Sequence, residues 1–141
     1  MVKYLLDTCT VIDFLRCNKR VQDKILSVGL ENCAISELTL AELYVGPKRI
    51  LVNRDSSNQD KERAELQIES LKLFKETFPV LPLTEFAEDF AEVHERLRQT
   101  GETIEDIDLL IGTFALSNGF ILITGNIRHF GRIPGLNLEN W

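Results

Sequence analysis

The sequence KYLLDTCTVIDFLR, residues 3–16, decides the fold of this chain because it joins a buried strand directly to a helix. Three apolar residues in a row, Tyr4, Leu5 and Leu6, predict the strand, and the apolar spacing that follows predicts the helix. Asp7 stands at the junction. In open α/β sheets the functional crevice lies at the carboxyl ends of the strands, so we expect Asp7 to lie where chemistry takes place.

The rest of the chain alternates short apolar runs with helical patterns. We expect strands at residues 33–36, 80–83, 120–124 and 136–138, and helices at residues 21–28, 38–44, 66–78, 86–97 and 104–117. Gly46 and Pro47 are expected to interrupt the second of these helices, residues 52–61 to form a loop, and Thr84 to cap the fourth. The alternation predicts an α/β fold with a mainly parallel sheet of four to five strands flanked by helices.

The length of 141 residues predicts one domain, residues 1–141, because single domains cluster at about 100 to 150 residues. No segment approaches the roughly 18 consecutive apolar residues that would cross a membrane. The chain begins Met-Val-Lys and enters the predicted strand at once, which leaves no space for a signal peptide. We therefore expect a cytoplasmic protein with no membrane partner.

Charge and cysteine content exclude several classes of function. The formal net charge of −6 disfavours a simple basic nucleic-acid binder, although a metal-dependent nuclease remains compatible because bound cations restore attraction locally. The three cysteines, Cys9, Cys17 and Cys33, are odd in number and form no C-x-x-C pair. This pattern argues against a disulfide framework and a zinc site, and it predicts reduced thiols.

Acids and amides stand near predicted strand ends or helix starts at four places, and each has a purely structural interpretation. Asp7 can cap the helix that follows it, and Glu42 can form a capping box with Thr39. Asn126 can cap a short helical turn, and Thr124 can be an ordinary hydroxyl at a strand end. Taken singly, none of these residues establishes a site.

Asp106 and Asp108, the fourth group, can be separated by helix geometry. Residues two apart lie about 200° round a helix, so both cannot face one site. Asp108 shares its face with Gly112 and Ala115, small residues that let the helix approach the sheet closely, whereas Asp106 fits the first turn. We therefore favour Asp108 as the site acid and Asp106 as an outer acid.

The acids of different segments indicate a metal site only when they are considered together. Two carboxylates about 5 Å apart repel by roughly 3 kcal/mol at an effective dielectric constant near 20, so converging acids raise one another's pKa unless a cation neutralises them. Oxygen ligands without Cys or His suit Mg²⁺ or Mn²⁺. Such a site favours phosphoryl-transfer chemistry. Arg128, His129 and Arg132 form a small basic patch near the same strand end that could contact phosphate.

Four segments together give the chain a family resemblance: LLDTCTVIDFL, ISELTLAELYVG, TGETIEDIDLLIGTFAL and ILITGNIRHFGRIPGLNLENW. In their order and spacing, the chain resembles the PIN-domain ribonucleases, and among them the VapC toxins of bacterial VapBC toxin–antitoxin pairs. The resemblance covers nearly the whole chain. It implies a three-layer PIN fold in which residues 50–78 form a protruding pair of helices.

The resemblance also implies an activity, partners and roles for individual residues. Asp7, Glu42 and Asp108 would bind Mg²⁺ or Mn²⁺ and hydrolyse RNA, with Thr8, Asp106, Thr124 and Asn126 as supporting residues. The implied substrate is structured RNA such as initiator tRNA, whose cleavage arrests translation. A VapB-like antitoxin would neutralise the chain, and a homodimer is implied as well.

Two positions depart from the family pattern, and two other functions remain open. Asn126 stands where many relatives have Asp, and Cys9 stands where Asn or Ser is common. The acid-poor fourth position and the negative net charge would suit a non-catalytic PIN module that binds RNA or protein. A phosphatase of the haloacid-dehalogenase type also begins with a strand, Asp and a helix, but its mechanism needs an acid where this chain has Cys9.

Overall fold

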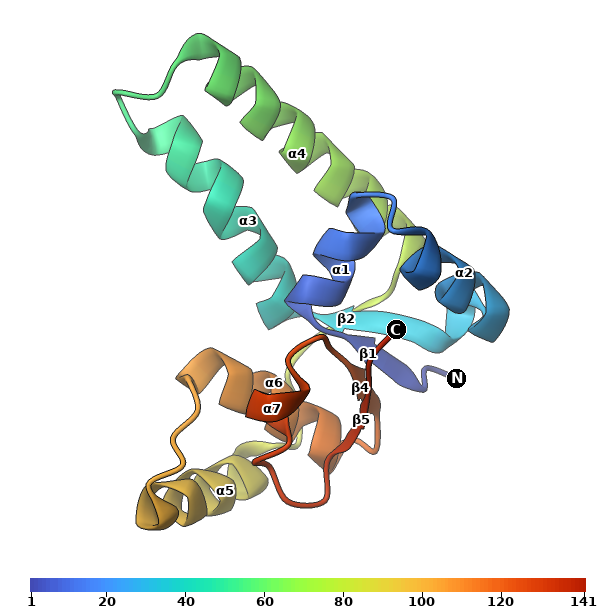
Figure 1. The fold of residues 1–141 in the computed structure, drawn as a ribbon, viewed down its shortest axis with the longest axis vertical. Helices are drawn as coiled ribbons and strands as arrows, with labels where there is room; N and C mark the ends of the chain where they lie inside the picture. Colours follow the sequence, from blue (N-terminus) through green and yellow to red (C-terminus); the bar gives the residue numbers. More distant parts are fainter.

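The computed structural model describes residues 1–141 and has a five-stranded sheet at its centre, with helices around it (Figure 1). The strands are β1 (Tyr4–Leu6), β2 (Cys33–Ser36), β3 (Val80–Leu81), β4 (Ile121–Ile123) and β5 (Asn137–Glu139). The helices are α1 (Thr8–Leu15), α2 (Lys19–Val28), α3 (Glu37–Val52), α4 (Asn58–Thr77), α5 (Ala87–Thr100), α6 (Asp106–Ser117) and α7 (Ile127–Phe130), with a single 3₁₀ turn at Leu30–Asn32.

The strand order is β3-β2-β1-β4-β5, and every neighbouring pair is parallel. This order confirms the predicted α/β class and places β1 in the middle, where Leu5 pairs with Ala34 on one side and Leu122 on the other. Because parallel strands end at the same edge, the segments that follow β1, β2 and β4 meet there. Asp7 and Thr124 are the residues immediately after β1 and β4.

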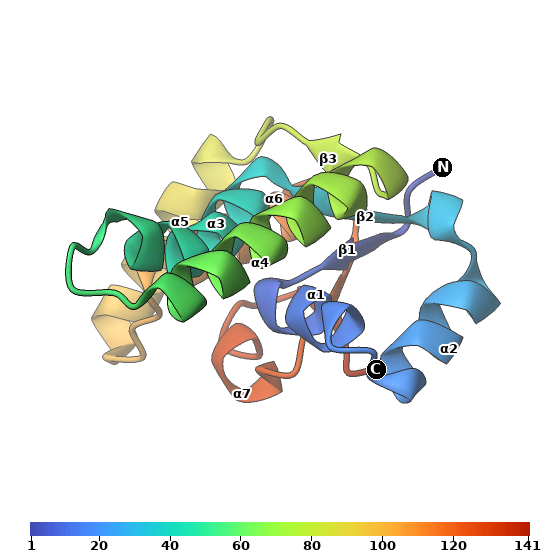
Figure 2. The same ribbon diagram turned by 90° about the horizontal axis from the view of Figure 1, so that it is seen from above.

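Two separate hydrophobic cores fill the two sides of the sheet. Successive side chains of a strand point to opposite faces, so Leu5 enters one core and Leu6 the other. The Leu6 core is built with α1, α2, α3 and α4, and the Leu5 core with α5 and α6. Figures 1 and 2 show the resulting three layers of helix, sheet and helix. Both leucines are fully buried.

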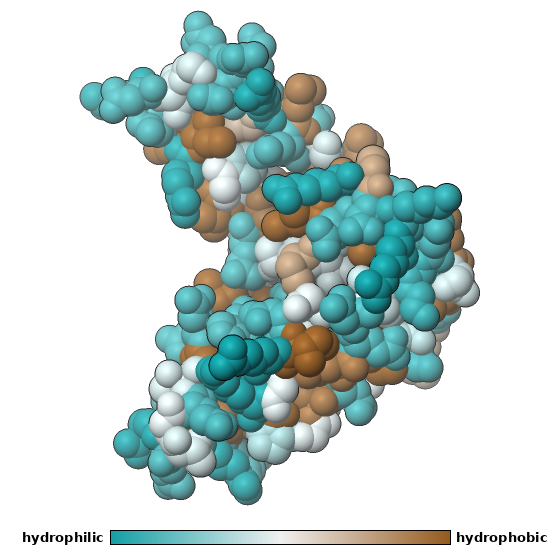
Figure 3. All heavy atoms as spheres, in the orientation of Figure 1, coloured by the Kyte–Doolittle hydropathy of each residue, from teal (hydrophilic) through white to brown (hydrophobic).

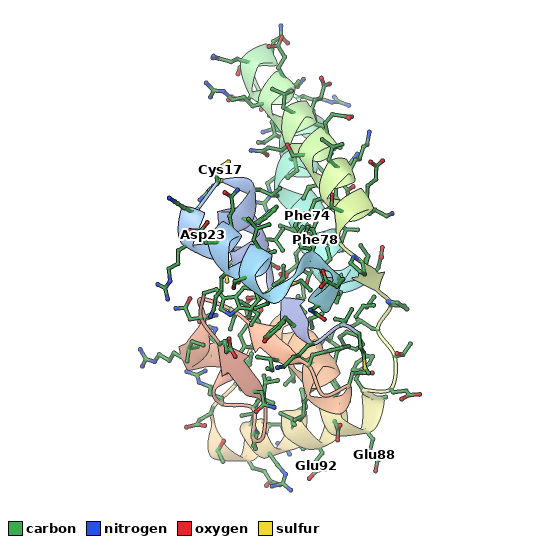
Figure 4. All side chains as sticks on the ribbon, turned by 90° about the vertical axis from the view of Figure 1, so that its right-hand side faces the viewer. Cys17, Asp23, Phe74, Phe78, Glu88 and Glu92 are labelled. Carbon is green, nitrogen blue, oxygen red and sulfur yellow. The ribbon has the colours of Figure 1, made fainter.

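An aromatic cluster fixes the base of α4 against α1. The rings of Phe74 and Phe78 stack with centroids 4.2 Å apart, and the edge of Phe14 packs against Phe78 at 5.4 Å. Figure 4 shows Phe74 of α4 and Phe78, the residue directly after α4, pointing into the interior, whereas Glu88 and Glu92 of α5 point to solvent. Such aromatic pairs add about 0.5–1.5 kcal/mol beyond the area they bury, so the cluster holds α4 firmly at this end.

Helices α3 and α4 form an antiparallel arm, residues 37–77, that projects from the sheet (Figure 1). The predicted break at Gly46 and Pro47 is wrong, since α3 continues through both to Val52. The predicted loop at 52–61 is too long, because Ser57 caps α4 by accepting a hydrogen bond from the Asp60 amide at 3.1 Å. Packing between the two helices outweighs the local preference of Pro47.

Two smaller expectations also differ from the structure. Thr84 does not cap α5, whose N-terminal residue follows Phe86; instead, the Thr84 carbonyl accepts a hydrogen bond from the Asn118 side chain at 3.1 Å. The strand expected at 80–83 is only the two residues of β3, which pair with β2 alone. The expected edge strand at 136–138 is confirmed, shifted by one residue, as β5. No helix is both long enough and apolar enough to cross a membrane.

Candidate active site

The carboxylate of Asp7 is buried and held by the neighbouring strand. Its side chain is only 5% exposed, and the Thr124 hydroxyl donates a hydrogen bond to Oδ2 at 2.8 Å. The Asp7 amide donates to the Ile123 carbonyl at 2.9 Å, which ties the end of β1 to the end of β4. Asp7 occupies the N-cap position of α1 but makes no side-chain cap, so the capping interpretation is wrong. The other carboxylate oxygen of Asp7, Oδ1, accepts no hydrogen bond within the chain and can bind another partner.

Cys9 takes part in the same hydrogen-bond network. Its Sγ lies 3.4 Å from Oδ2 of Asp7 and 3.6 Å from the Thr124 hydroxyl, and it accepts the Gly125 amide at 3.2 Å. Burial, followed by the negative charge of Asp7, raises the pKa of the Cys9 thiol. The protonated thiol can donate to Asp7 at neutral pH. Cys9 thus supplies the polar contact that the sequence pattern left in question.

Glu42 reaches the site from the first half of α3. The Thr8 hydroxyl donates a hydrogen bond to Glu42 Oε2 at 2.6 Å. The predicted capping box is wrong, because Ser36 is the N-cap of α3 and accepts the Thr39 amide at 3.0 Å. Since Ser36 satisfies the helix start, the Glu42 carboxylate is directed to α1 instead.

Asp108 lies in the first turn of α6 and is electrostatically coupled to the other acids. Burial, then the negative charges of Asp7, Glu42 and Glu105, raise its pKa from 3.8 to about 6. His129 counters this increase, with Nδ1 3.8 Å from Asp108 Oδ2. That nitrogen is buried and has no hydrogen-bond partner. The charges of Asp7 and Glu42 are therefore electrostatically coupled to Asp108, and these three acids are called the acidic cluster below.

The remaining predicted residues surround this cluster or face away from it. Asp106 is exposed on α6 and contributes no charge that perturbs Asp108. Asn126 does not cap α7 with its side chain, contrary to the capping interpretation, and its amide donates to the Thr124 hydroxyl at 2.9 Å. Arg128 is exposed on α7. Arg132 donates to the Thr103 carbonyl at 2.8 Å and thus holds the loop before α6.

Glu105 is the charged residue at the cluster that the sequence analysis missed. It precedes α6, is exposed, and its charge raises the pKa of Asp108. The sequence spacing could have identified Glu105, because it lies three residues before Asp108 and positions three apart share a helix face.

Gly112 explains how closely the elements of this region pack. A Cβ at this position would collide with the side chain of Ile133 and crowd Phe130. A small residue is needed here, but the predicted approach to the sheet is wrong, because the close neighbours of Gly112 are Phe130 of α7 and residues of the following loop.

The donor set of the cluster suits a hard divalent cation. No group of three His, Cys, Asp or Glu side chains is arranged in this structure to hold a metal ion. The three carboxylates nevertheless carry oxygen ligands of the kind Mg²⁺ and Mn²⁺ prefer, and no Lys or Arg forms an ion pair with any of them. Burial, followed by repulsion from Asp7, Glu42 and Glu105, raises the pKa of Asp108, and a bound cation would offset the repulsive part.

Comparison with known proteins resolves the family. The family model of the PIN domain matches residues 4–136. The chain belongs to the PIN domain family. Ribonuclease VapC2 of Haemophilus influenzae is 32% identical over 145 residues, which cover 100% of this chain and 99% of that protein. The tRNA(fMet)-specific endonuclease VapC of Salmonella typhimurium is 27% identical over 142 residues, with 100% and 99% coverage.

Solved structures agree with this assignment to the PIN family. VapBC2 from Rickettsia felis, bound to a promoter DNA fragment, contains a chain with a TM-score of 0.82 and 28% identity, covering 100% of this chain and 99% of that one. DNA-bound VapBC from Salmonella typhimurium gives a TM-score of 0.85 and 26% identity at the same coverage. Within the PIN domain family, the chain therefore belongs with the VapC ribonucleases.

Replacing Cys9 tests its contribution to this PIN site. We expect Cys9→Ala to lower kcat/KM for RNA cleavage about tenfold, because a hydrogen bond to a charged group contributes about 1.5–3 kcal/mol. Cys9→Ser, which keeps a donor and an acceptor, should restore most of the loss. Steady-state kinetics with both variants check this prediction, and equal rates for wild type and Cys9→Ala would contradict it.

The raised pKa of Asp108 predicts how stability depends on pH without metal. The folded chain holds this proton up to about pH 6, whereas the unfolded chain releases it near 3.8, so the folded state binds more protons between these values. The free energy of unfolding should therefore fall as the pH rises from 4 to 6, by at most about 3 kcal/mol. Thermal melts in EDTA measure the effect.

The matched variant for this pH dependence is Asp108→Asn, which cannot titrate. Its melting temperature should lack the decline between pH 4 and 6 that wild type shows. Adding Mn²⁺ should stabilise wild type more at pH 7.5 than at pH 5, because protons compete with the ion at low pH. The same pH profile in wild type and Asp108→Asn would show that another group titrates.

Proposed function

We propose that this chain is a toxin-type endoribonuclease that hydrolyses RNA phosphodiester bonds with Mg²⁺ or Mn²⁺ and thereby inhibits translation. The observation that supports the proposal is the electrostatic coupling of Asp108 to Asp7 and Glu42, with His129 as the basic group beside Asp108. Repelling carboxylates at this place in a PIN domain have a cation as their natural counter-charge.

Some residues of the site would bind the metal ion directly, and others would hold those ligands in place. Asp7, Glu42 and Asp108 would hold the ion, while Thr124 and Cys9 orient Asp7 through their hydrogen bonds. When bound, a divalent ion lowers the pKa of water and offsets the negative charge of the phosphoryl oxygens. The hydrogen bond from Thr8 keeps Glu42 directed at the site.

Basic groups of α7 would complete the substrate contacts. Arg128 is exposed and free of ion pairs, and His129 lies beside Asp108, so both can meet RNA phosphates entering the site. Arg132 would act at the same place, with one guanidinium nitrogen engaged by the Thr103 carbonyl. Figure 3 shows a hollow between the α3–α4 arm and the lower helices, on the side where RNA would approach.

Relatives support more specific proposals about substrate and partners. The Salmonella typhimurium relative is named for tRNA(fMet), so we propose tRNA as the substrate class. The structures of similar chains are VapBC complexes, which supports a VapB-like antitoxin for this chain. The α3–α4 arm would help to hold that antitoxin. A homodimer in the cytoplasm is part of the same proposal.

Mapping RNA ends in cells tests the proposed function. After brief induction of the chain, new 5′ ends should appear at discrete positions in tRNA, and they should be absent after induction of the Asp7→Asn variant. Co-expression of the cognate antitoxin should suppress them. Identical RNA ends with wild type and the variant would refute the proposal.

A further inference from the structure

A pocket adjoins the acidic cluster and is used by none of the interactions described so far. It has a volume of about 400 Å³, lies between α1, α3 and α4, and includes Thr8 and Glu42 in its lining. The pocket therefore borders the candidate ligand Glu42 and its hydrogen-bond partner Thr8. The volume falls within the range of about 300–1,000 Å³ typical of small-molecule sites.

The α3 wall of the pocket exposes bare backbone. Gly46 lies inside the helix, and no neighbouring atom lies within 4 Å of the place where a Cβ would stand. Glycine inside a helix costs about 1 kcal/mol relative to alanine, and nothing in the chain itself fills the space it leaves. Pro47 has no amide hydrogen, so it donates no helical bond to the carbonyl of Leu43, another lining residue. The wall therefore offers open space beside Gly46.

The remaining lining combines apolar faces with polar groups at the edges. Ile12, Leu15 and Leu71 are apolar, whereas Arg16 and Gln67 are polar and exposed. Arg16 forms no ion pair, although the chain carries a net charge of −6. The Gln67 amide has no hydrogen-bond partner within the chain, so its donors and acceptor are free for a ligand.

We propose that this pocket holds a nucleobase of the RNA substrate, next to the phosphodiester that lies at the acids. A nucleobase has two apolar faces and a polar edge, which match the leucine and isoleucine walls and the Gln67 amide. Sequence-specific RNA recognition uses unstacked single-stranded bases that are held in this way. Arg16 is placed to meet the phosphate of the same nucleotide.

This inference rests on the proposed ribonuclease function and specifies how that site selects its substrate. A peptide side chain would also fill apolar space, but it would leave the free Arg16 cation and the place of Glu42 in the lining unexplained. Recognition of one base beside the scissile bond accounts both for the unpaired Arg16 and for Glu42 in the pocket lining. The pocket thus sets the preferred nucleotide at the cleavage position.

Direct RNA binding tests the pocket separately from cleavage. The probe is a labelled pool of single-stranded RNA hexamers, bound to the full chain carrying Asp7→Asn so that nothing is cut. Adding Gly46→Leu fills the open space, and a thermal melt checks that the fold tolerates a side chain directly before Pro47. We expect the Kd for the pool to rise at least tenfold, while the chain still unfolds in one cooperative transition.

Base preference gives a second readout. In the otherwise wild-type chain, Gln67→Ala should flatten the sequence preference at one position of the cleaved hexamers, and Leu73→Ala, on the exposed side of α4, should leave it unchanged. Hexamer affinity unaltered by Gly46→Leu would overturn the nucleobase assignment. If that substitution weakens only the binding of the antitoxin, the pocket belongs to a protein partner. Failure of wild type to cleave RNA would instead refute the proposed function.

Discussion

Asp7→Asn is expected to reduce RNA cleavage at least about 1,000-fold while the chain stays folded. Asparagine keeps an oxygen that can accept the Thr124 hydrogen bond but loses the negative charge that a divalent ion needs. A loss of this size corresponds to about 4 kcal/mol of transition-state stabilisation. The measurement is kcat/KM on a short RNA in Mg²⁺, together with a thermal melt.

The same substitution has a second, independent consequence. Removing the charge of Asp7 removes one of the causes that raise the pKa of Asp108, so that pKa should fall towards its ordinary value. Carboxyl-carbon NMR titration would measure the change. Asp13→Asn, an exposed acid on α1, is the matched control and should alter neither cleavage nor this titration. Cleavage by Asp7→Asn at the wild-type rate would remove Asp7 from the mechanism.

Chelation of divalent ions is expected to abolish cleavage as completely as the loss of Asp7. The acids at the end of the sheet have no Lys or Arg partner, and His129 approaches Asp108 only to 3.8 Å. Without a cation, these acids would repel an approaching phosphodiester. Rates measured in EDTA should fall at least about 1,000-fold, and added Mn²⁺ or Mg²⁺ should restore them.

Two controls make the chelation experiment decisive. EDTA that has been saturated with Mg²⁺ beforehand should have no effect, which separates metal removal from inhibition by the chelator itself. The Asp108→Asn variant should need a higher Mn²⁺ concentration for half-maximal rate, because it has lost one ligand charge. Full activity of wild type in excess EDTA would identify a metal-independent ribonuclease.

The sequence predicted the sheet well because its strands carry a simple signal. Short apolar runs such as that ending at Leu6 are buried on both faces, and only a parallel sheet between helices provides such burial. The arm was predicted poorly. Gly46 and Pro47 are local breaking signals, and only the packing of α3 against α4, which joins distant residues, keeps the helix intact through them.

For the candidate site as well, the local sequence predicted some features, whereas other features depend on residues far apart in the chain. The acids could be selected from their places at strand ends and on helix faces. The capping interpretations of Asp7 and Glu42 could be rejected only when their partners were known, and these are Thr124, 117 residues away, and Thr8, 34 residues away. The part played by Cys9 depends on a backbone amide, that of Gly125, which no side-chain pattern reveals.

The central position of β1 has a consequence for biosynthesis. β1 is synthesised before its neighbour β4, which ends at Ile123, although the two strands pair side by side in the sheet. The hydroxyl that orients Asp7 belongs to Thr124, the residue after β4. The site therefore cannot assemble in a nascent chain until Thr124 has left the ribosome. We expect the chain to cleave no RNA before that point, beside the ribosome, mRNA and tRNA that are producing it.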